Sequence, residues 1–251
     1  GNTIAGAALT NGVYDYNVTS PLSEGSYTVN VAVSDLTGNA ASISQFVFIV
    51  DVNAPTGFTA SSSVGNNFTN NKKPTFTINA SDAGVANMVA HLLCNGSGTT
   101  DFAMNSPPLN IDTFDITTGG CNSSDGTKVI TAYVTDGLGH RTADVNVSVS
   151  YDGAGPSIPG SLDKANISNT SVDITWTAST DPNGANGSGV DRYRIYYSTT
   201  NSPPNSSGDS VDHPATQKNV SGLTACTTYF FWVDAVDNAG NASNKTDSIT
   251  F

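Results

Sequence analysis

Basic residues and glutamate are scarce in this sequence. Nine Lys and Arg residues stand against 21 acidic residues in a chain of 251, which gives a formal net charge of −12. Surfaces that bind nucleic acid need clustered Lys and Arg to neutralise phosphates, so nucleic acid is excluded as a partner. Long apolar runs are missing too. The longest, Phe46–Val50, has five residues, whereas a helix needs about 20 to span a bilayer, so we expect no direct membrane span in this segment.

Strong helix formers are also few, while turn formers are abundant. Ser, Thr, Asn and Gly make up 112 of the 251 residues, and 20 of the 21 acidic residues are Asp, with Glu24 the exception. Asp in such excess fits turns and calcium sites better than helix surfaces. Because apolar and polar residues also alternate regularly, the composition predicts an all-β fold with many loops.

Cysteine is limited to three residues, without a CxxC motif or the paired Cys/His spacing of a zinc finger. Cys94 and Cys121 fall in one predicted domain, and a disulfide between them would stabilise it by about 3–4 kcal/mol. Two buried free thiols are the alternative. Cys226 has no partner within its own predicted domain.

The sequence contains an internal repeat. A strand-like alternating run followed by Asp-x-x-Gly-Asn or Asp-x-x-Gly-His occurs three times, as GSYTVNVAVSDLTGN, GTKVITAYVTDGLGH and TTYFFWVDAVDNAGN. The Asp residues of the three copies, Asp35, Asp136 and Asp237, are spaced by 101 residues. One Ig-type sandwich has about 100 residues, so the period predicts tandem β-sandwiches.

A second series marks the linkers between the sandwiches. Asp51–Pro55 recurs 101 residues later as Asp152–Pro156, and Pro stiffens a junction without donating to a strand ladder. We therefore place the domains at 1–52, 53–153 and 154–251. The first range is long enough for only the C-terminal strands of a sandwich. Either the chain is an excerpt from a longer array, or this partial domain accepts a strand from a neighbouring molecule.

The third domain has the clearest pattern of alternation. Its segments VDITWTAST, GVDRYRIYYST and GLTACTTYFFWVDAVDNAGN resemble strands B, C and F of a fibronectin type III domain, and Leu223 and Tyr229 match the tyrosine corner of that family. The first two domains resemble bacterial and archaeal Ig-like repeats more loosely. The second has Lys128 at the corner Tyr position, so its corner must be closed differently, and a Cys94–Cys121 link is one way.

No motif predicts catalysis. His91, His140 and His213 are scattered over two domains, and neither G-x-S-x-G nor H-E-x-x-H occurs. Glu24 has no second Glu with which to hydrolyse a glycoside. We expect no enzyme activity and, apart from calcium, no cofactor.

Calcium sites are predicted at the domain junctions. In an Ig-type sandwich the B–C and F–G loops lie at the end that faces the preceding domain. The acidic and amide residues brought together are then Asp51, Asp82 and Asp136 at the first junction, and Asp152, Asp181, Asn183 and Asp237 at the second. Clustered carboxylates repel one another, and Ca²⁺ binds about six to eight oxygens. The alternative is that Asp35, Asp136 and Asp237 only cap their turns through backbone hydrogen bonds.

Sequons for N-glycosylation are about twice as frequent as the composition predicts. They lie at Asn17, Asn67, Asn79, Asn95, Asn122, Asn146, Asn166, Asn169, Asn186, Asn205, Asn219, Asn241 and Asn244. The excess favours a glycosylated, secreted protein. The alternative is that the composition produces the excess in a bacterium that does not glycosylate the protein.

An aromatic binding face is predicted on the third domain. If Tyr229, Phe231 and Val233 point inward, the residues between them point outward. The outer face then carries Arg192, Arg194, Tyr196, Phe230 and Trp232. Exposed aromatic clusters mark binding surfaces, although the rings could instead shield the sheet.

These features favour an extracellular, cell-surface role. The leading hypothesis is a structural or adhesive repeat segment of a stalk, filament or surface-layer protein. Its partners would be other copies or domains of that protein, glycans, or host or cell-surface proteins. The alternative is a spacer or accessory module of a secreted polysaccharide-degrading enzyme.

Overall fold

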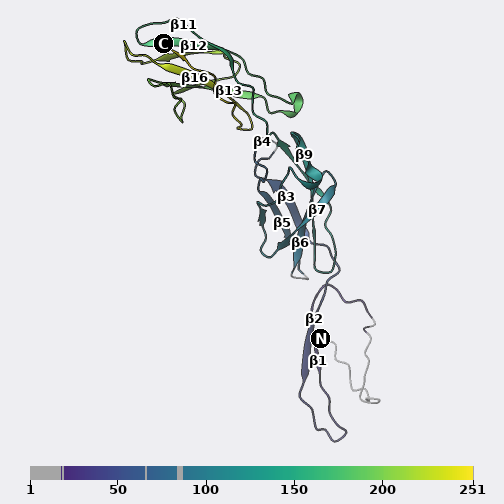
Figure 1. Ribbon diagram of the computed structural model, residues 1–251. Coiled ribbons are helices and arrows are strands. Elements are labelled where there is room, and N and C mark those ends of the chain that lie inside the picture. The colour runs from purple at the N-terminus through teal and green to yellow at the C-terminus, as the bar shows by residue number, and fades with distance from the viewer. Residues whose placement is uncertain (1–17, 19, 66, 84–86, 251) are drawn as a thin grey trace.

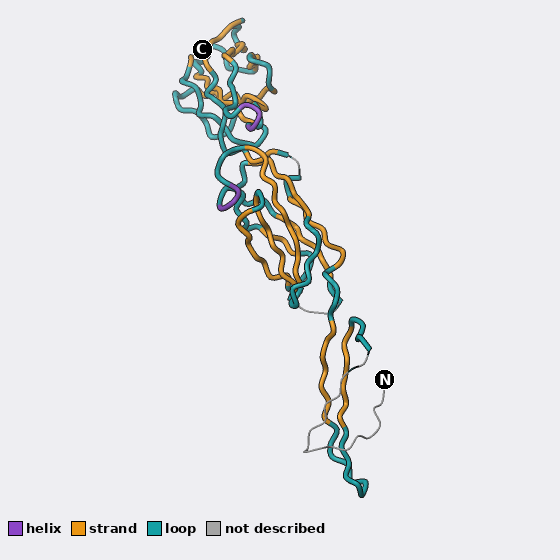
Figure 2. Tube along the Cα trace, turned by 90° about the vertical axis from the view of Figure 1, so that its right-hand side faces the viewer, coloured by secondary structure: helices purple, strands orange, loops and turns teal. Residues whose placement is uncertain are grey.

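The computed structural model describes residues 18, 20–65, 67–83 and 87–250. In this part of the chain it consists of strands, loops and two short 3₁₀ helices, which confirms the all-β fold class. Three units lie end to end, with the β1–β2 unit and the β11–β17 unit at opposite ends (Figures 1 and 2). Among the described strands, no sheet combines strands from two of the three predicted domains, while the exact boundaries stay a prediction.

The third unit is a two-layer sandwich with strand orders β11-β12-β15 and β14-β13-β16-β17. Its strands are β11 Gly160–Ala165, β12 Ser171–Thr177, β13 Val190–Ser198, β14 Asp209–Asp212, β15 Gln217–Ser221, β16 Phe230–Asp237 and β17 Ile249–Thr250, with the 3₁₀ helix η2 at Gly184–Asn186. The alternating residues of β12 are buried as predicted, and Trp176 packs on Tyr193 with ring centroids 5.1 Å apart.

The second unit has two facing sheets with strand orders β3-β5-β8 and β4-β10-β9-β6-β7. Its strands are β3 Thr56–Ser62, β4 Phe68–Thr69, β5 Phe76–Ser81, β6 Met88–Cys94, β7 Ser97–Met104, β8 Leu109–Ile111, β9 Gly126–Thr135 and β10 Val145–Tyr151, with the 3₁₀ helix η1 at Gly119–Cys121. Phe76, Leu92 and Ile130 come from both layers and are fully buried, so one core lies between the sheets.

The first unit shows that the sequence repeat is a repeat of strand pairing. Its two strands within the described residues, β1 Gly25–Val31 and β2 Ser44–Val50, pair antiparallel with Gly25 opposite Val50. In the second unit Gly126 lies opposite Tyr151, and each partner is displaced by 101 residues. The same spacing that predicted tandem units therefore preserves the register of these two strands.

The Asp-x-x-Gly turn that follows β1, β9 and β16 is also the same in all three units. Isolated bridges close it between Ser34 and Ala40, Thr135 and Arg141, and Val236 and Ala242. Its glycines, Gly38, Gly139 and Gly240, have φ angles of 92°, 94° and 93°. Side chains with a Cβ rarely adopt this region, so the turn requires glycine at this position.

Candidate functional site

Each Asp of the repeat closes its turn with its side chain. The Asp35 Oδ1 atom accepts hydrogen bonds from the backbone N–H groups of Thr37 at 2.9 Å and Asn39 at 2.8 Å. Its Oδ2 accepts one from the Asn39 amide at 2.7 Å. These bonds, the side-chain bond from Asn39 first, lower the pKa of Asp35 to about 2. The predicted turn-capping role of the repeat Asp is thus present in the structure.

Asp136 and Asp237 make the same bonds but are buried. Their turns contact the preceding unit, since His140 lies beside Asp51 and the Asn241 amide donates to the Asp152 carbonyl. Asp136 accepts from the backbone of Leu138 at 2.8 Å and His140 at 3.0 Å, and Asp237 from that of Ala239 at 2.9 Å and Asn241 at 2.8 Å. Burial raises the pKa of Asp136, but the hydrogen bonds outweigh it, so the net pKa lies below the ordinary value.

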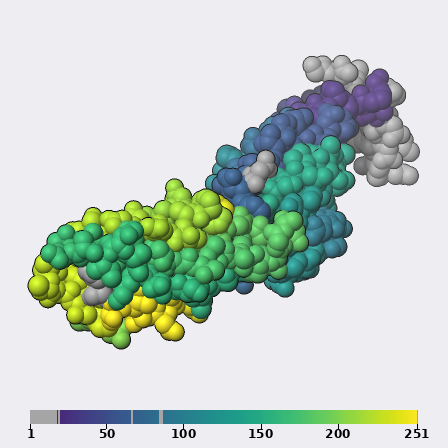
Figure 3. All heavy atoms as spheres, turned by 90° about the horizontal axis from the view of Figure 1, so that it is seen from above, coloured from purple at the N-terminus to yellow at the C-terminus, as the bar shows by residue number. Residues whose placement is uncertain are grey.

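The second junction brings three carboxylates together. Asp152 follows β10, Asp181 lies in the loop between β12 and β13, and Asp237 ends β16. One oxygen of each lies within 4.8 Å of the others. Asp152 is fully buried, and its Oδ2 accepts a hydrogen bond from the backbone N–H of Ser188 at 2.7 Å. Figure 3 shows the surfaces of the second and third units in contact with each other.

Asp181 is the least satisfied member of this cluster. Its Oδ2 accepts a hydrogen bond from the Gly189 N–H, but its buried Oδ1 has no hydrogen-bond partner among the described residues. Burial raises the pKa of Asp181, and the negative charges of Asp152, Asp237 and Asp125 raise it further. An all-oxygen donor set with a buried, unpartnered carboxylate oxygen is chemically suited to Ca²⁺.

Asn183, the fourth predicted ligand, makes its side-chain hydrogen bond to a further aspartate. Its amide donates to the Asp125 Oδ2 at 2.6 Å, and the Asp125 Oδ1 accepts from the Gly153 N–H at 2.7 Å. Asp125 precedes β9 and Gly153 lies in the linker, so the Asn183 bond ties the second unit to a loop of the third. Sequence reasoning missed Asp125, although Glu24 occupies the equivalent position 101 residues earlier.

The first junction repeats this arrangement with different side chains. Asp51, which follows β2, belongs to two groups of potential metal ligands. One group adds Asp136 and His140, and the other adds Glu24 and Asp82. Within each group, one ligand atom of each residue lies within 4.8 Å of the others. The structure therefore brings the predicted Asp51, Asp82 and Asp136 to one junction and adds Glu24 and His140. The signal that could have found His140 is its place in the repeat, where the other two copies have Asn39 and Asn241.

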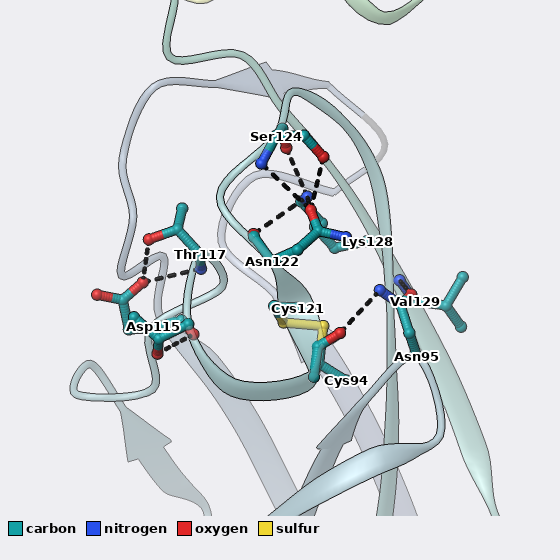
Figure 4. Close-up of a disulfide and its surroundings, with 11 residues drawn as sticks. Cys94, Asn95, Asp115, Thr117, Cys121, Asn122, Ser124, Lys128 and Val129 are labelled. Atoms are coloured by element: carbon teal, nitrogen blue, oxygen red, sulfur yellow. Dashed lines mark hydrogen bonds between the residues drawn. A yellow bond between two sulfur atoms is a disulfide. The ribbon is translucent and has the colours of Figure 1, made fainter.

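The corner of the second unit is closed by Lys128 itself (Figure 4). Its side chain is 2% exposed, and its ammonium group donates to the Asn122 Oδ1 at 2.9 Å, the Ser124 carbonyl at 2.6 Å and the Asn122 carbonyl at 3.4 Å. Burial lowers the pKa of Lys128, and the nearby Asp125 charge partly offsets this. In the third unit, the Tyr229 hydroxyl accepts from the Thr224 N–H at 3.3 Å instead.

A disulfide lies beside this corner. It joins Cys94, the last residue of β6, to Cys121, the last residue of η1, with a Cα–Cα distance of 5.0 Å. Both residues are buried, whereas Cys226 is exposed and free. The disulfide and Lys128 therefore both hold the segment that precedes β9.

The predicted binding face is largely covered, which corrects the expectation of exposed rings. Tyr196 is 2% exposed and Trp232 5% exposed, because they lie opposite each other in the sheet and Phe230 stacks on Trp232. The Lys245 ammonium lies 4.2 Å from the centre of the Tyr196 ring. The rings shield the sheet, as the alternative reading held.

Asp234, which was not predicted from the sequence, is the ion-pair partner of Arg194 on this face. The Arg194 guanidinium donates to the Asp234 Oδ1 at 2.9 Å and to its Oδ2 at 2.6 Å. The Asp234 side chain is 3% exposed, so this ion pair neutralises a nearly buried charge. Arg192 is exposed and pairs with Asp191.

Most sequon asparagines are at the surface. Asn17 lies outside the described residues, Asn241 is half-buried, and the other sequon asparagines are exposed. The Asn241 amide nitrogen donates to the Asp237 Oδ2 and to the carbonyl of Asp152, both at 2.9 Å, and a glycan on this nitrogen would break that network. Glycosylation at the exposed positions stays a prediction.

The amide groups of Asn166 and Asn219 have a structural role as well. Each donates to a carboxylate oxygen of Asp173 at 2.6 Å, and Gln217 donates at 2.8 Å. These bonds, the one from Asn166 first, lower the pKa of Asp173. They connect β12 and β15 on the outer face of the smaller sheet.

Comparison with known proteins agrees with the fold at both ends of the chain. Residues 157–251 match the sequence profile of the fibronectin type III domain, and residues 1–52 match that of a bacterial Ig-like domain. The fibronectin domains FN1–FN3 of chicken CNTN1 superpose with a TM-score of 0.54 at 12% identity, over 90% of this chain and 75% of that one. In the described part of the chain, no helix is long and apolar enough to cross a membrane.

Two bacterial enzymes contain regions similar to this chain. Exoglucanase B of Cellulomonas fimi is 30% identical over 258 residues, which cover 97% of this chain and 21% of the exoglucanase. Chitinase Chi52 of Paenibacillus xylanexedens is 36% identical over 118 residues, which cover 47% of this chain and 19% of the chitinase. The chain therefore spans about a fifth of the length of these relatives.

Proposed function

We propose that this chain, a tandem of Ig-like repeats that ends in a fibronectin type III domain, is a non-catalytic spacer of an extracellular polysaccharide-degrading enzyme. The observation that supports it is the similarity of nearly the whole chain to about a fifth of an exoglucanase. Units that lie end to end, with hydrogen bonds across the second junction, suit a segment that holds other domains apart.

The complete gene and the isolated chain test this proposal together. We expect the gene to encode a catalytic domain in the same polypeptide, and the purified chain to release no soluble sugar from chitin or cellulose. Hydrolysis by the purified chain would contradict the non-catalytic role, and a gene without any catalytic domain would contradict the spacer role.

A second candidate is a structural or adhesive segment of a cell-surface stalk, filament or surface layer. The match of residues 1–52 to a bacterial Ig-like domain favours it, because such repeats build long arrays. Its partners would be further copies or domains of the same protein, glycans, or proteins of a host or cell surface. Electron microscopy of native material would show fibres or ordered arrays under this reading and none under the first.

We also propose that the second junction binds Ca²⁺ and thereby stiffens the spacer. Asp152, Asp181 and Asp237 come from the linker, the B–C loop and the end of strand F, so a cation bound to all three restrains the third unit against the linker. The cation would also neutralise repulsion among carboxylates that are largely withdrawn from water.

The variant Asp181→Asn tests the calcium site. In the wild-type chain at pH 7, Ca²⁺ at about 100 times its dissociation constant should stabilise the third unit by about 2.7 kcal/mol relative to chelator, and this increment should vanish in the variant. Thermal melts followed by tryptophan fluorescence measure it, since both Trp residues, Trp176 and Trp232, lie in the third unit.

The pH dependence in chelator has a defined sign. Because the pKa of Asp181 is raised in the folded state, this group adds stability below its ordinary value of 3.8, and that stability is lost as pH rises through the folded pKa. Asp181→Asn should therefore melt higher than the wild type in chelator at pH 7.

The matched control for the calcium experiment is Asp163→Asn. Asp163 is exposed and lies outside the cluster, so this variant should keep the full stabilisation by Ca²⁺. An equal calcium response in Asp181→Asn and wild type would refute the site.

A further inference from the structure

The first junction differs from the second in one ligand type. At the fifth residue of the Asp-x-x-Gly turn, the first and third copies have Asn39 and Asn241, whereas the second has His140. The turn geometry is the same, because the Oδ2 of the repeat Asp accepts from the Asn39 amide at 2.7 Å, from His140 Nδ1 at 2.8 Å and from the Asn241 amide at 2.9 Å. The histidine therefore replaces an amide that would serve the turn equally well.

His140 lies between two buried carboxylates. Its Nδ1 is 2.8 Å from the Asp136 Oδ2 and 3.9 Å from the Asp51 Oδ1. The side chains of both aspartates are 0% exposed, while that of His140 is 34% exposed, so the imidazole lies on the solvent side of the cluster. One ligand atom of each of the three residues lies within 4.8 Å of the others. Tetrahedral ligands at about 2.0–2.1 Å from a zinc ion are about 3.3 Å apart, so a small inward movement brings these three groups to bonding distance. The imidazole nitrogen that binds zinc releases any proton it holds to solvent, and a water takes the fourth position.

Asp51 supplies an independent indication of a missing ligand. It is nearly fully buried, and its Oδ2 has no hydrogen-bond partner among the described residues. Among the described residues, its Oδ1 accepts one hydrogen bond, from the Asn53 N–H at 3.3 Å, which is long for this class of bond. Buried carboxylates are normally paired, hydrogen-bonded or bound to a metal. A cation that His140 and Asp136 also bind would satisfy Asp51.

The donor atoms of Asp51, Asp136 and His140 indicate the class of metal that these three residues suit, whereas Glu24 and Asp82, the other ligand pair beside Asp51, offer only oxygen. Ca²⁺ takes oxygen ligands, which is the set that Asp152, Asp181 and Asp237 offer at the second junction. Imidazole nitrogen together with carboxylate oxygen suits zinc and its neighbours among the divalent transition metals. We propose that Asp51, Asp136 and His140 form a zinc site that fastens the first unit to the second. This site goes beyond the spacer function, and its test does not depend on that function.

Isothermal titration of the chelator-treated chain with Zn²⁺ tests the proposal on wild type and His140→Asn. The wild type should bind one Zn²⁺ tightly at this site, and the variant should bind it at least about 100-fold more weakly, since ligand loss costs no less than loss of a supporting residue. Binding of Co²⁺ should give visible absorption bands in the wild type that the variant lacks. Because Asn39 and Asn241 make the same turn bond, the metal-free variant should melt at the wild-type temperature.

The matched control is His91→Asn. His91 also contacts a carboxylate, with Nδ1 2.7 Å from the Asp101 Oδ1, but its Nε2 faces the Thr135 hydroxyl at 2.8 Å instead of a second carboxylate. This variant should bind Zn²⁺ as the wild type does. Equal Zn²⁺ affinity in wild type and His140→Asn, or no Zn²⁺ binding by a folded wild-type chain, would overturn the proposal. A Ca²⁺ affinity at this junction that exceeds the Zn²⁺ affinity would overturn it as well.

Discussion

Replacing Cys94 and Cys121 by alanine is expected to lower the free energy of unfolding of the second unit by about 3.5 kcal/mol. The two cysteines are 27 residues apart in sequence, and a cross-link that closes such a loop removes about this much chain entropy from the unfolded state. The loss should be confined to the second unit, because the disulfide joins β6 to η1 within it.

Two spectroscopic signals separate this effect from a general loss of stability. Both tryptophans belong to the third unit, so tryptophan fluorescence in urea should show an unchanged midpoint for that unit. Far-ultraviolet circular dichroism reports all units and should show part of its amplitude lost at lower urea. Cys226→Ala is the control, since Cys226 is exposed and free, and it should change neither signal. If the double variant unfolds like the wild type, the disulfide does not stabilise the fold.

Lys128→Met is expected to cost the second unit about 3 kcal/mol. Methionine keeps most of the apolar length of the side chain but leaves the carbonyls of Ser124 and Asn122 without the Lys128 donor, while the Asn122 Oδ1 keeps its two bonds from Ser124. Each hydrogen bond to a charged group contributes about 1.5–3 kcal/mol, and we expect the total loss to stay near the upper value because solvent reaches Asn122 and Ser124 and replaces part of what is lost. The same urea experiment measures the change.

Lys72→Met is the matched control for this substitution. Lys72 is exposed in the same unit, so the same chemical change there should alter the free energy of unfolding by less than about 0.5 kcal/mol. An equally small effect of Lys128→Met would mean that the buried ammonium group is not needed and that the disulfide alone closes this corner.

The alternation of β12 and the 101-residue spacing were enough to predict the sandwiches. Both are local properties of the chain: side chains of successive strand residues point to opposite faces, and a repeated pattern folds into a repeated unit. The burial of Val172, Ile174 and Trp176 and the shared register of β1–β2 and β9–β10 follow directly from them.

The prediction of an exposed aromatic face was wrong, and the alternation of apolar and polar residues along a strand could not have revealed why. Pointing outward from a sheet does not make a ring exposed when its cross-strand neighbours are as large as itself. Tyr196 and Trp232 cover each other, and Asp234 and Lys245 complete the layer from other positions of the chain. The register between β13 and β16 determines that Tyr196 meets Trp232, and the fold of the chain after β16 brings Lys245 to the Tyr196 ring.

The sequence alone determined that this protein is a tandem of β-sandwiches, because strand alternation and repeat spacing are local patterns. It also indicated which aspartates meet at the junctions, because the loop positions of a sandwich follow from its strand order. Only the tertiary structure decided which partners each polar group has: that Lys128 closes a corner, that Asp125 binds Asn183, and that His140 lies beside Asp51. Such contacts join residues of different strands and units, and their distances depend on how whole units pack, which no local pattern contains.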